Sequence, residues 1–204
     1  TYLYNAYFPA PELWKRLQAD FENVVRHYPA GQNTLCAIAA DALGLQAGLL
    51  TIANGASELI RIVCGRLGKR IIVPAPSFDE YMNATPPGNL VCHALRAPDF
   101  ALDVDAFAED AIRSKAEIAI VVTPNNPTSL AMPRAELLRL CERLERAGIL
   151  LLLDESFVEF GKEPENLSIL DCVPRLPNLA IVKSLSKIYG VCGIRLGYLY
   201  TGDT

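Results

Sequence analysis

The stretch that decides the fold lies near the end of the chain and reads Ser184-Leu185-Ser186-Lys187-Ile188-Tyr189-Gly190-Val191-Cys192-Gly193-Ile194-Arg195-Leu196-Gly197-Tyr198. It follows an apolar run, residues 179–182, whose composition predicts a strand buried on both faces. A lysine comes just after this strand, with a serine on either side, and an arginine follows eight positions later. Small residues between them let other groups approach the backbone closely. We therefore expect a ligand to bind where this strand ends.

The lysine and the arginine indicate what this ligand carries. Lys187 can form a Schiff base with an aldehyde. The planar fork of Arg195 can donate two parallel hydrogen bonds to a phosphate. An aldehyde and a phosphate on one ligand suggest pyridoxal phosphate (PLP). The alternative for Lys187 is a surface lysine in a loop after a strand, and the motifs in the rest of the chain argue against it.

The same stretch also satisfies a motif of an unrelated class of enzyme. Ser184-Leu185-Ser186-Lys187 matches the SxxK pattern of serine acyl-transferases of the penicillin-binding type. Those enzymes also need Ser-Asp-Asn and Lys-Thr-Gly elements, and neither tripeptide occurs in this sequence. The pattern alone therefore gives little support to a serine nucleophile.

Composition places the chain among globular domains. Of its 204 residues 51% are hydrophobic and 21% are charged, which allows a large buried core and argues against disorder. The net charge of −4 argues against nucleic acid or an anionic membrane as the main partner. There is no apolar run of about 18 residues and no visible signal peptide, so we expect a cytoplasmic protein. The first residue is not Met, which suggests a processed or truncated chain.

Cysteines and histidines show no pattern of a disulfide framework or a metal site. The six cysteines are scattered, none with CxxC spacing, and most lie in apolar segments, as expected for buried free thiols in a reducing cytosol. His27 and His93 are far apart and belong to no metal-ligand motif. We therefore expect no metal site.

Strand-like and helix-like segments alternate from residue 49 onward. Apolar runs predict strands near 49–53, 71–73, 90–95, 117–122, 149–153 and 179–182. Helical periods lie at about 12–26, 33–43, 57–67, 104–114 and 133–147, the last with Pro133 in its first turn and Gly148 at its end. The alternation predicts an α/β fold, a three-layer sandwich around a mostly parallel sheet. We expect residues 1–30 to form an arm and a helix, and residues 31–204 to form one domain.

Ligands of such sheets bind beyond the carboxyl ends of the strands, so the residues that follow each strand are informative. Asn54-Gly55-Ala56-Ser57-Glu58 opens a helix, where free amides and the helix dipole suit an anion. The alternative is an ordinary Ser N-cap with Glu in the first turn.

Tyr81 follows the second strand and is an aromatic that could stack on a flat heteroaromatic ring. The alternative interpretation is that Tyr81 packs as an ordinary residue of a helix.

Two further groups follow the later strands. Thr123-Pro124-Asn125-Asn126-Pro127-Thr128 is a turn fixed by two prolines, from which an amide side chain projects. Asp154 follows five apolar residues, where an ionised carboxylate is costly unless it has a partner. A protonated pyridine nitrogen is such a partner, and this pairing keeps the ring able to accept electrons.

In this order and spacing the motifs resemble the PLP-binding large domain of fold-type I enzymes, in the class I and II aminotransferases. The chain looks most like the branch that holds histidinol-phosphate aminotransferase and threonine-phosphate decarboxylase, and the resemblance spans residues 25–200. It implies that Lys187 forms the Schiff base, that Asp154 meets the ring nitrogen and that Tyr81 stacks on the ring. Asn126 would bond the phenolic oxygen, and Tyr28 would reach the PLP phosphate of the neighbouring subunit of a homodimer. The resemblance also implies a set of phosphate ligands, namely the amides of Ala56 and Ser57 and the side chains of Ser184, Ser186 and Arg195.

The sequence departs from the family pattern in three respects. Phe157 stands where many aminotransferases have a Tyr that bonds the phenolic oxygen, and Ser129 stands where Gly is common. Few residues follow Lys187, so the C-terminal small domain and its substrate-binding arginine have no counterpart.

The leading hypothesis is an aminotransferase that acts on a small amino acid, perhaps phosphorylated, and an oxo acid. One alternative, towards which Phe157 leans, is a decarboxylase of the threonine-phosphate type. The other is a non-catalytic or truncated fragment that keeps the fold.

Overall fold

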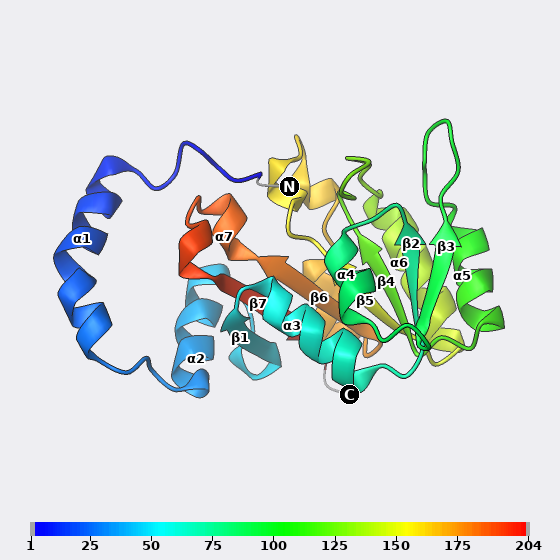
Figure 1. The fold of residues 1–204 in the computed structure, drawn as a ribbon, viewed down its shortest axis with the longest axis horizontal. Coiled ribbons are helices and arrows are strands. Elements are labelled where there is room, and N and C mark those ends of the chain that lie inside the picture. Colours follow the sequence, from blue (N-terminus) through cyan, green and yellow to red (C-terminus); the bar gives the residue numbers. More distant parts are fainter. Residues whose placement is uncertain (1–2, 203–204) are drawn as a thin grey trace.

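The computed structural model describes residues 3–202 and shows one seven-stranded sheet with helices on both faces (Figure 1). The strands are β1 Leu50–Asn54, β2 Ile71–Ala75, β3 Leu90–Ala94, β4 Ile118–Val122, β5 Leu150–Asp154, β6 Leu179–Ser184 and β7 Leu196–Thr201. Their order is β1-β7-β6-β5-β4-β2-β3. β7 runs antiparallel to both of its neighbours, and the other pairs are parallel. The predicted mostly parallel sheet is thus confirmed, with β7 as the strand that the sequence analysis missed.

Five of the α-helices lie close to the segments with a helical period, but the two short helices at 79–84 and 185–188 were not predicted. The helices are α1 Pro11–Arg26, α2 Gln32–Leu43, α3 Ala56–Ile62, α4 Asp79–Ala84, α5 Val104–Arg113, α6 Arg134–Arg146 and α7 Leu185–Ile188. Pro133 is the residue before α6 rather than part of its first turn, while Gly148 follows the helix with the positive φ of 67° that glycine permits. Within residues 3–202 there is no helix of the length and apolarity that crossing a membrane requires.

The parallel strands β2, β4, β5 and β6 are buried on both faces, which explains their continuous apolar runs. In β5, Leu151 and Leu153 face the cluster that contains side chains of α2, α5 and α6, whereas Leu152 faces the cluster that contains side chains of α3 and α4. Each fully buried leucine side chain stabilises the fold by about 1.5–3 kcal/mol relative to an exposed one. The result is the three-layer sandwich that the alternation of elements predicts.

The N-terminal part of the chain consists of a helix, α1, that has no buried residue and an arm that contacts α7. No residue of α1 is buried, and Figure 1 shows this helix away from the body of the molecule. The arm that precedes it returns to α7: the backbone N–H of Asn5 donates to the carbonyl of Lys187 at 2.8 Å, and its side chain donates to Ile188 at 3.0 Å. The ring of Phe8 lies 5.4 Å from that of Tyr189.

The cysteines are free thiols, as the sequence analysis predicts. Four of them are buried, but Cys92 and Cys192 are exposed, so the predicted burial is correct for four of the six cysteines. Burial raises the pKa of the Cys64 thiol to about 11, which keeps it protonated at neutral pH.

Candidate active site

The candidate residues gather where the carboxyl ends of the parallel strands meet. Asp154, the last residue of β5, is paired with Val122 of β4 and with Val182 of β6. β7 is antiparallel, so its first residues lie at this same edge, and Gly197 is paired with Ser184 of β6. This strand therefore brings Arg195, the residue before it, to the end of β6. The sheet order thus explains how an arginine eight positions beyond Lys187 joins the same site.

A cavity of about 390 Å³ opens at this edge. It is lined by Leu3, Tyr4, Ala56, Ser57, Ile60, Phe78, Asp154, Ser156, Ser184, Ser186, Lys187, Cys192 and Arg195. Seven of the predicted site residues are among them: Ala56, Ser57, Asp154, Ser184, Ser186, Lys187 and Arg195. The structure therefore brings together residues that the sequence separates by more than a hundred positions.

Lys187 lies on α7 with its amine between two aromatic rings. Its Nζ is 4.0 Å from the centroid of the Phe157 ring and 5.4 Å from that of Phe78. Burial lowers the pKa of Lys187, and the positive charge of Arg195 acts in the same direction, while the carboxylate of Asp154 opposes both. A lowered pKa increases the fraction of neutral amine, which is the form that attacks an aldehyde.

Asp154 is a buried carboxylate whose two oxygens have fixed partners. It is 3% exposed, its Oδ1 accepts a hydrogen bond from the Ser156 N–H at 2.9 Å, and its Oδ2 accepts one from the Tyr81 hydroxyl at 2.7 Å. None of the ion pairs within residues 3–202 involves it. A buried carboxylate is costly without a positive partner. A cationic group in the cavity, such as the protonated ring nitrogen of PLP, would supply one.

The start of α3 and the Arg195 side chain form the positive end of the cavity. α3 begins at Ala56 after Gly55, with no side-chain cap, so Ser57 is not the N-cap that the alternative interpretation required. Gly55 has φ +78°, and a Cβ there would lie 2.9 Å from Cζ of Arg195. A Cβ on Gly197 would lie 2.7 Å from the Gly55 carbonyl carbon. Only glycine at these two positions lets the guanidinium and β7 approach the helix start, where the dipole suits an anion.

The two serines beside Lys187 differ in what their hydroxyls do. Ser186 Oγ donates to the Leu196 carbonyl at 3.1 Å and accepts from the Leu196 N–H at 2.9 Å, so it joins α7 to β7. To bind a phosphate, Ser186 would have to give up the first of these bonds. Ser184 lines the cavity, and its N–H donates to Ser156 Oγ at 2.9 Å. The predicted phosphate role therefore fits Ser184 better.

The expectation that Tyr81 stacks on the cofactor ring is corrected by the structure. Tyr81 lies in α4, is 0% exposed and does not line the cavity, so its ring has no face free for a ligand. It packs as a helix residue, which was the alternative interpretation. The aromatic ring that does line the cavity is Phe78, three positions earlier. Phe78 comes immediately before α4, closer to the end of β2, and this position in the sequence would have identified it.

The remaining predicted residues lie beside the cavity or away from it. Asn126 and Phe157 line a neighbouring hollow. In the same turn Asn125, not Asn126, makes the structural hydrogen bonds, to Pro76, Ser77 and Thr128. Ser129 has φ +62°, so it adopts the backbone conformation for which the family commonly uses glycine. Tyr28 is fully exposed and does not line the cavity of its own chain.

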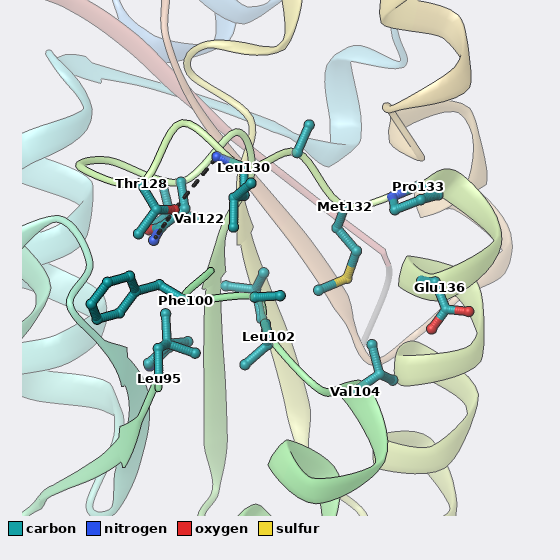
Figure 2. Close-up of a pocket in the computed structure, with 15 residues that line it drawn as sticks. Leu95, Phe100, Leu102, Val104, Val122, Thr128, Leu130, Met132, Pro133 and Glu136 are labelled. Carbon is teal, nitrogen blue, oxygen red and sulfur yellow. Dashed lines mark hydrogen bonds between the residues drawn. The ribbon is translucent and has the colours of Figure 1, made fainter. Parts of the chain in front are cut away.

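The cavity also contains residues that the sequence analysis missed. Ser156 lies in the turn after β5, Cys192 begins the 3-10 helix Cys192–Ile194, and Leu3 and Tyr4 belong to the N-terminal arm. The sequence predicts an arm but not that it reaches the cavity, because its place depends on a hydrogen bond to α7, more than 180 residues away in the sequence. A second, separate cavity of about 210 Å³ has a mainly apolar lining that includes Phe100, Leu130 and Met132 (Figure 2).

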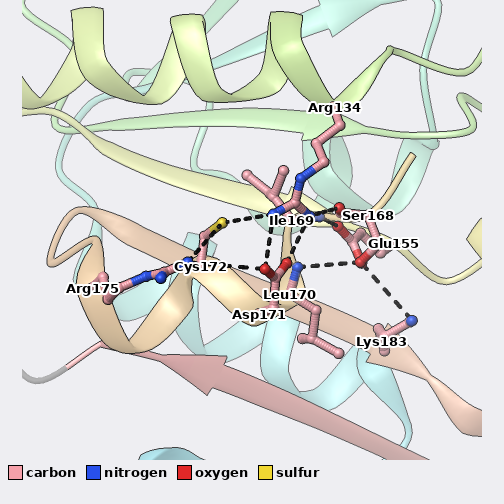
Figure 3. Close-up of polar contacts among 9 residues, drawn as sticks. All are labelled: Arg134, Glu155, Ser168, Ile169, Leu170, Asp171, Cys172, Arg175 and Lys183. Carbon is pink, nitrogen blue, oxygen red and sulfur yellow. Dashed lines mark hydrogen bonds and ion pairs between the residues drawn. The ribbon is translucent and has the colours of Figure 1, made fainter. Parts of the chain in front are cut away.

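A buried polar cluster supports the site from the other side of the sheet (Figure 3). Glu155 is 0% exposed and accepts hydrogen bonds from Ser168 Oγ at 2.6 Å and from the Ile169 N–H at 3.0 Å. Lys183 Nζ lies 3.9 Å from its Oε2 and also pairs with Glu159. Burial raises the pKa of Glu155, and the charge of Lys183 counteracts this. The cluster joins β6, which leads to Lys187, to the loop that carries Phe157.

Comparison with known proteins settles the family. The model of the family "Aminotransferase class I and II" matches residues 6–204. The chain belongs to this family. PLP is the cofactor of the family, and the cavity has residue types that fit it: an amine, a buried carboxylate and a positive end.

Two relatives show what share of a longer protein this chain matches. It is 43% identical over 202 residues to CMP-5'-(3-aminopropyl)phosphonate synthase of Streptomyces rubellomurinus, covering 99% of this chain and 32% of that protein. It is 33% identical over 165 residues to histidinol-phosphate aminotransferase of Chlorobaculum tepidum, covering 78% of this chain and 45% of that protein. The chain thus spans less than half the length of either relative.

Two solved structures share the fold. A decarboxylase from Sulfurospirillum multivorans superposes with a TM-score of 0.85 at 28% identity, over 98% of this chain and 53% of that one. Histidinol-phosphate aminotransferase from Sinorhizobium meliloti, solved in complex with pyridoxal-5'-phosphate, superposes with a TM-score of 0.83 at 21% identity, over 98% of this chain and 55% of that one. The sheet described here thus has the α/β fold of the large domain of PLP-dependent transferases.

Proposed function

We propose that the protein is a PLP-dependent aminotransferase that acts on a small amino acid through a Schiff base at Lys187. The observation that carries this proposal is the placement of the Lys187 amine, the Asp154 carboxylate and the Arg195 guanidinium around one cavity. PLP, when bound, supplies an electron sink for the substrate carbon that loses a bond. Lys187, once released, would hold and return the α-proton, which its lowered pKa favours.

The positions of the remaining residues suggest which part of PLP each of them would contact. The amides of Ala56 and Ser57, with Ser184 and Arg195, would hold the phosphate, and Ser186 would assist them. Phe78 would stack on the ring in place of Tyr81. Asn126 would bond the phenolic oxygen from the neighbouring hollow, beside Phe157.

The proposal extends to the assembly of the protein. Residues 31–204 would form the PLP-binding domain, and residues 1–30 an arm and helix. Because Tyr28 is exposed and away from its own cavity, it would reach the phosphate of a second subunit. We therefore propose a cytoplasmic homodimer in which each active site uses both subunits.

Decarboxylation is the second candidate reaction, and Phe157 favours it. Phe157 lies against Lys187 but has no hydroxyl to bond the phenolic oxygen. The structure that superposes at 28% identity is that of a decarboxylase, and the relative at 43% identity is named for an aminopropyl phosphonate. These names suggest a substrate that carries a phosphate or a phosphonate group. Incubation with phosphothreonine separates the candidates: release of carbon dioxide with no oxo acid would assign decarboxylation.

Absorbance and borohydride trapping test the Schiff base directly. The protein with PLP should show a visible imine band that borohydride bleaches, with the label on the peptide that contains Lys187. Lys187→Ala should abolish the trapped adduct, whereas Lys162→Ala, at an exposed position, should leave it intact. Asp154→Ala should weaken PLP binding and abolish turnover. An adduct of unchanged yield in Lys187→Ala would refute the proposal.

A further inference from the structure

The Tyr81 hydroxyl, which contacts Asp154, has no role in the function proposed above. Tyr81 Oη, from α4, donates a hydrogen bond of 2.7 Å to Asp154 Oδ2, and Asp154 lines the cavity whereas Tyr81 does not. Tyr81 is 0% exposed, so no water competes for this bond. The one bond that its hydroxyl makes is therefore directed at the carboxylate that faces the cavity.

Tyr81 is held rigidly enough to fix the position of that carboxylate. Its carbonyl accepts a hydrogen bond of 2.7 Å from Thr85 Oγ1, also in the interior. Its ring packs edge-on against Phe78, with ring centroids 6.2 Å apart. Burial and the neighbouring Asp154 charge keep the pKa of Tyr81 well above its usual value, so the phenol keeps its proton and remains a donor. Asp154 thus faces a fixed donor.

We propose that Tyr81 is a positioning residue: its hydroxyl holds the Asp154 carboxylate in the orientation that receives the ring nitrogen of PLP. This inference rests on the proposed function, because it concerns the same cofactor site. The Ser156 N–H holds the other oxygen at 2.9 Å, so the two bonds together fix the plane of the carboxylate. Without the hydroxyl, one oxygen of a buried carboxylate would lose its donor, and the carboxylate would rotate more easily.

The size of the effect follows from the type of bond. A hydrogen bond to a charged group is stronger than one between neutral groups, so its loss should be measurable as a change in PLP affinity. We therefore expect Tyr81→Phe, which removes only the hydroxyl, to bind PLP about tenfold more weakly. The imine band should also titrate at a higher pH, because a misoriented carboxylate pairs less well with the protonated ring nitrogen, and loss of that positive charge makes the imine less acidic.

The matched control is the tyrosine at position 200. Tyr200 is also buried, and its hydroxyl accepts one hydrogen bond, from the Gln46 N–H at 3.3 Å, in the cluster on the other face of the sheet. Tyr200→Phe should keep the affinity for PLP and the pH midpoint of the imine band. Thermal unfolding of the PLP-free proteins would show whether the two variants fold equally well.

A double-mutant cycle decides whether Tyr81 acts through Asp154. In the Asp154→Asn background, which keeps the shape of the side chain but removes its charge, Tyr81→Phe should change PLP affinity by less than about twofold. An equal loss in both backgrounds would overturn the inference, since it would mean that the hydroxyl acts through packing. Wild-type affinity and midpoint in Tyr81→Phe would overturn it as well. If the wild-type protein traps no PLP at Lys187, the proposed function fails instead.

Discussion

Lys187 shows how the environment of one residue changes its chemistry. Its amine is next to the rings of Phe157 and Phe78, and burial removes much of the water that would stabilise a positive charge. The aromatic faces attract a cation weakly, yet the net effect is a lowered pKa. Reactivity of this amine should therefore extend to lower pH than that of an ordinary lysine.

This leads to a prediction for the PLP-free protein. An amine with a lowered pKa loses its proton at a lower pH, so Lys187 should react with an amine reagent at lower pH than the lysine of a short unstructured peptide does. The rate of trinitrophenylation of the Lys187 peptide, followed against pH, measures this. The midpoint for Lys187 should lie below that for the lysine of the unstructured peptide. Coincident midpoints would show that burial does not control this amine.

At the level of elements, β5 and β6 are joined by charges as well as by the sheet. Lys183 is 6% exposed and is the cation closest to the fully buried Glu155 among the ion pairs of the described chain. Breaking a buried pair by removing one partner typically costs about 3–5 kcal/mol. Lys183→Met should therefore lower the free energy of unfolding by about 3 kcal/mol, measured by urea denaturation. Lys162→Met, at an exposed position, is the control and should change it little.

The same cluster predicts a dependence of stability on pH. Because burial raises the pKa of Glu155 in the folded state, its protonated form is favoured on folding. Its contribution to stability is present below the ordinary pKa of glutamate and is lost as the pH rises through the raised value. Glu155→Gln should remove this loss, so its free energy of unfolding should vary less with pH than that of the wild type. Parallel curves for the two proteins would contradict the assignment.

The elements also show what the sequence could and could not predict. Six strands were predictable because residues such as Leu151 and Leu152 face opposite buried layers, which produces continuous apolar runs. β7 was not, because glycine and tyrosine interrupt its apolar residues and its pairing with β1 is non-local. Likewise, strand ends predicted Asp154 and Lys187, whereas the choice between Phe78 and Tyr81 depended on where α4 begins.

On the scale of the whole molecule, the buried sheet contrasts with the exposed helix α1. Trp14 is 47% exposed and Phe21 67% exposed, and no residue of this helix is buried. A single helix of this length is only marginally stable in water without tertiary packing. In the proposed homodimer, the second subunit would supply a surface for the apolar side chains of α1.

Tyr28, two residues beyond α1, allows a test of the shared active site. If each site uses Lys187 from one subunit and Tyr28 from the other, mixing Lys187→Ala with Tyr28→Ala subunits should create one intact site in each mixed dimer. At equal amounts about a quarter of all sites would then be intact. Imine formation and turnover should recover to that level from the lower values of each variant alone. If mixed dimers form, as mass spectrometry would show, but nothing recovers, Tyr28 acts within its own subunit or has no role in the site.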